Sequence, residues 1–451
     1  MFLCNHKQAA SKMDSPSTFF DIKLRGHFRM RIPFHFLKYR QIFRTKFLAL
    51  MMASGLVFGG VSAQAADFEL MAKKARGQTV YFNAWGGSPQ TNSYIAWAGS
   101  QIKSRYGVTL VHVKLTETAD AVARILAEKS AGKTRGGSVD LVWVNGENFA
   151  SLKRQGLLRS DSWAFALPSF AYTDAEALPG IISDFANPTD GLESPWGRAQ
   201  LVFGYDTQFV PNPPRSAEEL ANWIEKNPGR FTFPQPPDFT GTSFLKQILL
   251  EVSPDKGIFA APASEADTKT ALAPLFSWLD RVRPHLWRGG VNYPPNYTSM
   301  VQLLGDGELA IAMAFNPAEF SNGISQGILP DSVRTYIHDA GTLANVHFVA
   351  IPFNASAADG AQVVANFLLS PEAQIRKANP ELWGDPTVLS IPKLDATDAK
   401  AAKTLICPTL ETKVDIFFAP IKYPIKYPES IKPVDTKLKS SLTALIPNRE
   451  P

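Results

Sequence analysis

The chain has 451 residues, with 46 Lys and Arg against 41 Asp and Glu, which gives a formal net charge of +5. The positive excess comes from residues 1–65, which hold ten basic and two acidic residues, so the remainder has 36 basic and 39 acidic residues. Because the remainder is mildly acidic and no basic cluster is interleaved with aromatic residues, we exclude nucleic acid as a partner.

The first 65 residues have the pattern of an export signal with an N-terminal extension. Three basic residues between positions 40 and 46 precede the apolar stretch 47–61, which is short for a membrane span. Small residues follow, so we predict cleavage after Ala65 and a soluble periplasmic product. Met30 is an alternative start. Cys407 then remains as a single cysteine, which excludes an intramolecular disulfide.

From residue 79 onward, strand-like and helix-like segments alternate. The strands are predicted at 79–85, 108–115 and 139–144, and the helices at 92–107, 120–132 and 147–158. Three successive strand–helix units predict a parallel sheet flanked by helices.

A second series of elements follows a proline-rich loop region, residues 159–197. We predict strands at 199–206, 309–315 and 346–353, and helices at 216–227, 243–251, 268–282 and 357–374. The repeat at 419–433, rich in Pro and Lys, is predicted to be extended and solvated.

The turns after the first three strands share polar, glycine-bearing and aromatic residues. In a parallel sheet the carboxyl ends of the strands face one crevice, so these turns are expected to converge there. Each residue alone fits turn chemistry as well as it fits ligand contact, and the shared character of the turns favours ligand contact. The predicted contacts are Trp85, Gly86, Gly87, Thr116, Glu117, Thr118, Asn145, Gly146 and Glu147.

The stretch "FTFPQPPDFTGTSFL", residues 231–245, predicts a strand end, a proline-rich turn and a helix start. Asp238, Thr240, Gly241 and Thr242 lie at that turn. A helix N-terminus has unpaired N–H groups, so hydroxyls and a glycine there favour binding of an anion. The alternative is that Thr or Ser only caps the helix.

Motifs for catalysis or metal binding are missing from the sequence. It contains neither H-E-x-x-H nor G-x-S-x-G. The four histidines after residue 65 lack ligand spacing, so we expect surface or hydrogen-bonded interior residues, with no metal and no cofactor.

Several segments together resemble the periplasmic solute-binding proteins of ABC importers, and among them the YnjB-type proteins, which are similar to thiamine, polyamine and ferric-iron binders. They are "TVYFNAWGG", "VDLVWVNGENFASLKRQGLL", "PWGRAQLVFGYD", "LLGDGELAIAMAFNPAEF" and "VVANFLLSPEAQ". The resemblance implies a type II two-lobe α/β fold with mixed sheets flanked by helices and a ligand cleft between the lobes. It places lobe one at 66–200 and 342–451, and lobe two at 201–341.

The resemblance also implies the partners: a small-molecule ligand, a permease and its ATPase at the inner membrane, with the binding protein itself a monomer. "PDFTGTSF" resembles the stretch of thiamine binders that supplies hydroxyls and amides to phosphate, and "LTETAD" resembles their other phosphate-facing turn. Tyr293 and Asn316 lie in further segments that we expect at the cleft.

The residue types at these turns indicate the chemistry of the ligand. Aromatic faces combined with carboxylates suit an organic cation. We therefore expect a cationic, thiamine-like solute, with or without a phosphate group. The alternative is an exported enzyme, a transferase or hydrolase, on the same two-lobe scaffold. The aromatic residues are Trp85, Trp143, Phe149, Tyr293 and Tyr297, and the acidic residues are Glu117, Glu147 and Asp238. Trp143 alternates inside a predicted strand, which favours a place in the core over a stacking face.

Overall fold

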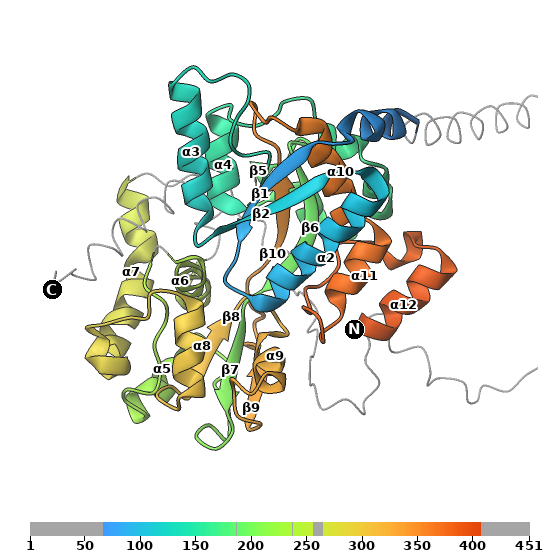
Figure 1. Ribbon diagram of the computed structural model, residues 1–451. Coiled ribbons are helices and arrows are strands. Elements are labelled where there is room, and N and C mark those ends of the chain that lie inside the picture. Colours follow the sequence, from blue (N-terminus) through green and yellow to red (C-terminus); the bar gives the residue numbers. More distant parts are fainter. Residues whose placement is uncertain (1–65, 186, 237, 256–264, 407–451) are drawn as a thin grey trace, which may run out of the picture. The chain divides into compact units, whose positions relative to one another are not determined.

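Two β-sheets organise the part of the chain that the structure describes, which is residues 66–185, 187–236, 238–255 and 265–406 of a computed structural model (Figure 1). From Leu70 onward the chain forms one compact unit, and the description below concerns that unit. The predicted signal peptide and its cleavage site, Cys407 and the repeat at 419–433 all lie outside the described residues.

The larger sheet has five strands in the order β2-β1-β3-β10-β6. Strand β1 (Thr79–Trp85) is parallel to β2 (Thr109–Leu115) and β3 (Leu141–Val144), which confirms the predicted parallel strands. Strand β10 (Ala344–Ala350) is antiparallel to β3 and to β6 (Glu193–Gln200). Strand β6 therefore runs in the same direction as β1, β2 and β3, and all four carboxyl ends lie at one edge of the sheet.

Helices cover both faces of this sheet (Figure 1). Helices α3 (Thr118–Ser130) and α4 (Gly146–Arg154) pack on one face, while α2 (Pro89–Tyr106) and α10 (Ala358–Leu368) pack on the other. We call this sheet and its helices the large lobe, which also contains α11 (Pro371–Ala378) and α12 (Ala396–Ile406).

The single helix predicted at 357–374 is wrong, because the chain forms two helices there. Helix α10 ends at Leu368, and Ser370 caps the start of α11 with its side chain accepting from the Ala373 N–H. Pro371 is the first residue of α11, where its missing N–H costs no hydrogen bond. The Ser-Pro pair is thus the start signal of a new helix.

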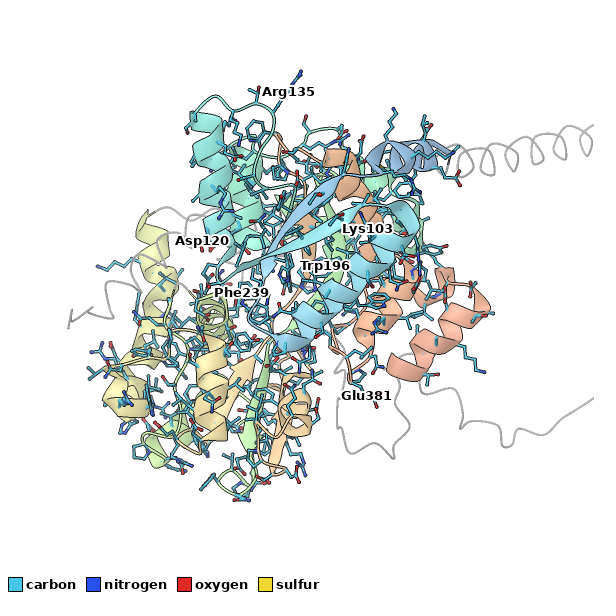
Figure 2. All side chains as sticks on the ribbon, viewed as in Figure 1. Lys103, Asp120, Arg135, Trp196, Phe239 and Glu381 are labelled. Carbon is cyan, nitrogen blue, oxygen red and sulfur yellow. The ribbon has the colours of Figure 1, made fainter. Side chains whose placement is uncertain are left out.

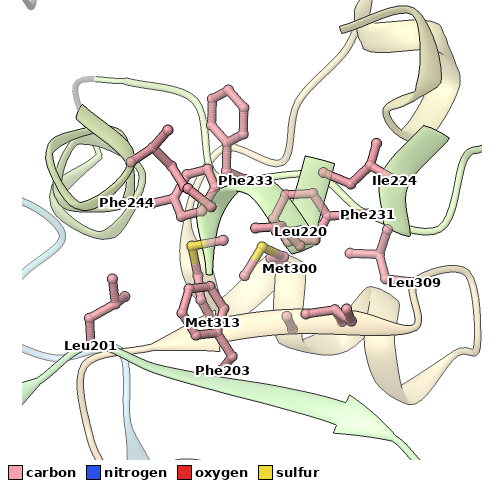
Figure 3. Packing of buried hydrophobic residues seen from close by; sticks show 14 of the residues in the cluster. Leu201, Phe203, Leu220, Ile224, Phe231, Phe233, Phe244, Met300, Leu309 and Met313 are labelled. Carbon is pink, nitrogen blue, oxygen red and sulfur yellow. The ribbon is translucent and has the colours of Figure 1, made fainter. Parts of the chain in front are cut away.

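The smaller sheet has three strands in the order β8-β7-β9, with both pairs antiparallel. We call this sheet and its helices the small lobe. Its buried side chains form a continuous apolar cluster, in which Phe203 of β7 lies beside Met313 of the neighbouring strand (Figure 3). Its elements are β7 (Val202–Asp206), β8 (Ile311–Ala314), β9 (Val333–Tyr336), α5 (Ala217–Lys226), α6 (Phe239–Val252), α7 (Glu265–Val282), α8 (Tyr297–Gly305) and α9 (Glu319–Ser325).

Short elements complete the described chain. A two-stranded ladder joins β4 (Ser183–Asp184) and β5 (Asn187–Pro188), which fall in the proline-rich region expected to be loop. The 3₁₀ turns are Trp163–Ala166, Pro168–Tyr172, Pro179–Ile181, Arg283–His285, Trp287–Gly290 and Ile391–Lys393.

The predicted strand at 199–206 is wrong as a single element, because it is divided between the two sheets. Strand β6 ends at Gln200 and β7 begins at Val202. Between them the Leu201 N–H donates to the Leu343 carbonyl at 2.8 Å, on the segment where the chain returns to β10. The chain therefore crosses between the sheets at these two leucines. The residue limits of the two lobes stay a prediction.

The strand end predicted at 231–233 is also wrong. Phe231 and Phe233 are buried in the small-lobe core, but neither belongs to a strand. The Phe231 carbonyl instead accepts from the Trp287 N–H at 2.8 Å. Prolines 234 and 236 follow directly, and they lack the N–H groups that a ladder needs.

We expect Phe203→Ala to destabilise the protein by about 3–5 kcal/mol, because it removes a fully buried ring and leaves a cavity. Urea unfolding followed by circular dichroism measures this change. Val291→Ala is the control, since Val291 is 67% exposed and the change should stay within about 0.5 kcal/mol. Equal effects of the two substitutions would contradict the packing described here.

Candidate ligand-binding site

A cavity of about 590 Å³ lies where the carboxyl ends of β1 and β2 face the starts of α6 and α8. Residues of both lobes line it, which is the arrangement a ligand cleft requires. The lining consists of Trp85, Gly86, Gly87, Lys114, Leu115, Thr116, Glu117, Asp238, Asn296, Tyr297, Thr298, Ser299 and Gln302.

Two aromatic rings form the apolar part of the cavity wall. The rings of Trp85, at the end of β1, and Tyr297, at the start of α8, have centroids 5.6 Å apart and planes inclined at 37°. Gly87 allows this position of the indole, because a Cβ at residue 87 would lie 2.2 Å from the Trp85 ring. Trp85 and Tyr297 therefore offer flat faces to a solute from opposite lobes.

Two carboxylates lie beside these rings. Asp238 is only 8% exposed, and its Oδ1 accepts from the Gly241 N–H at 2.8 Å, so it caps α6. Burial raises the pKa of Asp238 to about 6, although the N–H groups of Gly241 and Thr240 act in the opposite direction. Glu117, at the turn between β2 and α3, supplies the second carboxylate of the lining.

A further acid, Glu319, lies close to Tyr297. Burial raises the pKa of Glu319 to about 7. The pKa of the Tyr297 hydroxyl is raised mainly by burial and further by the charges of Glu319 and Asp238. The charges of two carboxyl groups therefore act on the Tyr297 hydroxyl, and its surroundings are acidic when both are ionised.

Lys114 supplies a positive charge to the cavity, and the start of α8 supplies polar groups. The Asn296 side chain caps this helix by accepting from the Ser299 N–H at 2.9 Å and from the Ser299 hydroxyl at 3.0 Å. Thr298 and Ser299 add hydroxyl groups to the lining. The cavity therefore combines two carboxylates, one lysine and a helix start, all beside two aromatic faces.

Six of the predicted contacts line this cavity: Trp85, Gly86, Gly87, Thr116, Glu117 and Asp238. Sequence reasoning missed Lys114, Leu115, Asn296, Thr298, Ser299 and Gln302 as lining residues, and treated Tyr297 only as a stacking face. The signal for α8 was present, because Asn296 three residues before Ser299 is a common helix start after a proline-rich turn.

Thr240, Gly241 and Thr242 do not belong to the described lining. Thr240 and Thr242 are 3% and 4% exposed, inside the first turns of α6, which begins at Phe239 rather than at residue 243. The cap is Asp238, so neither the expected Thr nor a Ser has that role. A Cβ at Gly241 would lie 1.9 Å from the Pro234 carbonyl oxygen, so the glycine serves close packing of the chain against itself.

The turn at 145–147 lies outside the lining as well. Asn145 is at the cap position of α4 without a side-chain capping bond, and Glu147 is exposed in the first turn. The buried Gly146 N–H donates to Asp184 Oδ2 at 2.6 Å. This turn is thus held in place by a hydrogen bond within the large lobe.

Three other predicted contacts have structural partners. The Thr118 hydroxyl donates to the Trp143 carbonyl at 3.2 Å, and the Tyr293 ring packs 5.1 Å from the ring of Phe233. The Asn316 side chain donates to the Trp383 carbonyl at 3.1 Å. None of the three is in the described lining, so direct contact with a solute stays a prediction for them.

Two of the aromatic residues considered as stacking faces lie elsewhere. Phe149 is fully buried in the large-lobe core, so the expectation of a stacking face is wrong there. Trp143 packs with its ring centroid 4.8 Å from Trp196 and 4.9 Å from His347. Figure 2 labels Trp196 inside the large lobe and Phe239 at the start of α6 in the small lobe.

A buried acid pair lies behind the turn at 145–147. Asp184 and Glu193 are each 1% exposed, and neither oxygen of the Glu193 carboxyl has a hydrogen-bond partner among the described residues. Burial raises the pKa of both groups, and the charge of Asp184 raises that of Glu193 further, while Lys153 lowers it. Two such carboxyls are stable in the protein only with protons retained.

The described part of the chain has neither a membrane-spanning helix nor a metal-binding cluster. Its helices include none long and apolar enough to cross a membrane, and it has no group of three or more His, Cys, Asp or Glu side chains suited to a metal ion.

Comparison with known proteins agrees with this two-lobe architecture. A family model for bacterial extracellular solute-binding proteins matches residues 97–404. The chain is 46% identical over 334 residues to protein YnjB of Escherichia coli strain K12, covering 74% of this chain and 85% of that protein.

Solved structures share the fold. The substrate-binding protein of a spermidine/putrescine ABC transporter from Streptococcus pneumoniae has a TM-score of 0.55 at 15% identity, covering 82% of this chain and 98% of its own. A ferric binding protein from Campylobacter jejuni has a TM-score of 0.54 at 14% identity, covering 80% and 99%. At these identities the likeness concerns the fold alone.

The sheets and their flanking helices thus have the periplasmic binding protein fold. The chain belongs to the bacterial extracellular solute-binding proteins, a family whose members deliver ligands to ABC permeases.

We expect Glu193→Gln to flatten the pH dependence of stability. The raised pKa values mean that the folded protein holds protons that the unfolded chain releases above about pH 4–4.5, so stability falls as the pH rises. A neutral amide at residue 193 removes the contribution of Glu193, while the contribution that burial gives to Asp184 remains, so the variant should exceed the wild type in stability at pH 8.

Urea unfolding at pH 5, 6, 7 and 8 measures the free energy of unfolding of both proteins. Glu176→Gln is the matched control, since Glu176 is exposed. Parallel pH profiles for the wild type and Glu193→Gln would show that the pair does not retain a proton.

Proposed function

We propose that this protein captures a small organic cation in the periplasm and delivers it to an ABC permease with its ATPase. The solute is thiamine-like, with or without a phosphate group, and the binding protein acts as a monomer. The observation that carries the proposal is the cavity in which the rings of Trp85 and Tyr297 lie beside the carboxylates of Asp238 and Glu117.

The charge and shape of this wall favour a cation with a flat, delocalised ring. An organic cation over the face of Trp or Tyr is attracted by the ring quadrupole, by about 0.5–2 kcal/mol depending on desolvation. The raised pKa of Asp238 indicates that its negative charge lacks a compensating partner. A cation in the cavity would supply that partner and favour the ionised form.

Other residues of the lining support an anionic group on the same solute. Lys114 supplies a positive charge, and Thr298 supplies a hydroxyl group at the start of α8, where the Ser299 hydroxyl already donates to Asn296. A phosphate or an alcohol of a thiamine-like solute would contact these groups, while its aromatic ring would pack against the exposed faces of Trp85 and Tyr297. The role of export in this proposal rests on the family and on the apolar stretch 47–61.

We expect one solute to bind per chain and to be recovered chemically unchanged. A binding protein needs no bond to be made or broken, because transport requires only capture and release. Native mass spectrometry of protein purified from periplasm, followed by mass spectrometry of the released solute before and after long incubation, measures both. Steady conversion of the solute into a product would support the exported enzyme instead.

Asp238→Asn should weaken binding of the recovered solute about tenfold to a hundredfold, since hydrogen bonds to charged groups contribute about 1.5–3 kcal/mol. Asn caps helices as well as Asp does, so the start of α6 is retained while the charge is removed. Calorimetric titration measures the affinity, and thermal melting checks the fold.

Asp120→Asn is the matched control, because Asp120 is an exposed acid in the first turn of α3 (Figure 2). It removes the same charge without touching the cavity. If both variants keep wild-type affinity, the proposed role of the Asp238 carboxylate is wrong.

A further inference from the structure

Arg198 lies at the edge of the larger sheet where its parallel strands end. It lies near the carboxyl end of β6, paired with Val346 of β10, three residues before the crossing at Leu201. Because β6 is parallel to β1, β2 and β3, this residue shares the edge at which those strands end. That edge is where open α/β sheets bind ligands.

The guanidinium of Arg198 has no protein partner. It is partly exposed, and among the described residues no oxygen accepts a hydrogen bond from it or forms an ion pair with it. Burial lowers its pKa, so protein surrounds much of the side chain. An arginine in such a position keeps its charge and has five N–H donors to satisfy.

The opposing charge that acts on Arg198 belongs to Asp385, which already has other partners. Asp385 Oδ2 accepts from the ammonium of the fully buried Lys377 and lies 3.0 Å from Nε2 of His347. Asp385 partly offsets the effect of burial on the pKa of Arg198, while Arg198 itself lowers the pKa of Lys377. Two cationic side chains thus depend on one carboxylate, and an uncompensated positive charge remains at Arg198.

We propose that Arg198 binds an oxyanion, a phosphate or carboxylate group, beside the crossing between the two lobes. The planar guanidinium presents paired donors that match two oxygens of either group. The proposal rests on the proposed function in one respect. Arg198 is not among the residues that line the cavity, so the oxyanion is either a part of the captured solute that extends beyond the cavity or a separate small anion.

The start of α6 is a poorer candidate for this anion. Its N–H groups already have the Asp238 carboxylate as cap, and a second negative charge there would be repelled. Arg198 needs no such rearrangement, because its donors are not engaged by protein.

Inorganic phosphate and acetate are the two probes, and they distinguish a phosphate site from a carboxylate site. Wild-type protein and the Arg198→Lys variant are labelled with [¹⁵N]arginine and freed of solute by dialysis. The Nε–Hε resonance that is present in the wild type and missing from the variant belongs to Arg198. We expect that resonance to shift saturably with phosphate or with acetate. Absence of a shift with both probes overturns the proposal without relying on the folding of a neutral variant.

Calorimetry at low salt gives the second measurement. Arg198→Gln should weaken binding of whichever probe shifts the resonance at least tenfold. Arg198→Lys should weaken it less, because the positive charge stays while the paired N–H donors of the guanidinium are lost. Arg124→Gln, an exposed arginine on α3, is the charge-matched control and should leave the affinity unchanged. Equal affinities of wild type and Arg198→Gln overturn the proposal.

Mass spectrometry of solute released from wild-type protein separates this proposal from the proposed function. If an organic solute is recovered but the Arg198 resonance shifts with neither probe, the proposed function stands and the oxyanion site is wrong. If the Arg198 resonance shifts with a probe but no organic solute is ever recovered, the oxyanion site stands and the proposed function is wrong.

Discussion

The arrangement of this protein depends on the crossing of two chain segments at Leu201 and Leu343. One backbone hydrogen bond joins them, and on either side the chain enters a different sheet. The direction in which β6 leaves the larger sheet follows from this crossing. Because β6 runs with β1, β2 and β3, the polar turns at their ends open toward the small lobe. Their position relative to Asp238 and α8 is therefore a consequence of topology, before any side chain is considered.

Sequence periodicity predicted most elements of this arrangement, and the exceptions have physical causes. Strand β1 falls at 79–85 as expected, since alternating apolar residues there are bounded by a glycine-rich turn. The strand at 199–206 was predicted as one element because no proline or glycine marks Leu201, and only the partner strands reveal the break. The interior of α8 was missed because nine residues are too few for a clear helical period.

The candidate site was predicted in part for a similar reason. Turns that follow parallel strands can be assigned to an edge from the order of elements alone, and Trp85, Thr116 and Glu117 were found in this way. Burial depends on neighbours that are distant in sequence. The Pro234 carbonyl against Gly241 and the cap at Asp238 therefore could not be read from "DFTGTSF". The charge of Asp238 at a buried helix start is a local cost, which the cation of the proposed function would offset.

The carbonyl of Trp383 has a consequence for how tightly any solute is held. It accepts from Asn316 and also from Asn322, both at 3.1 Å, so two side chains of the small lobe share one acceptor of the large lobe. Separation of the lobes loses both hydrogen bonds together, which costs about 1–3 kcal/mol. Apparent affinity scales with the fraction of molecules in the binding-competent arrangement. Substitution of these asparagines can therefore change the apparent affinity for the solute without changing the residues that contact it.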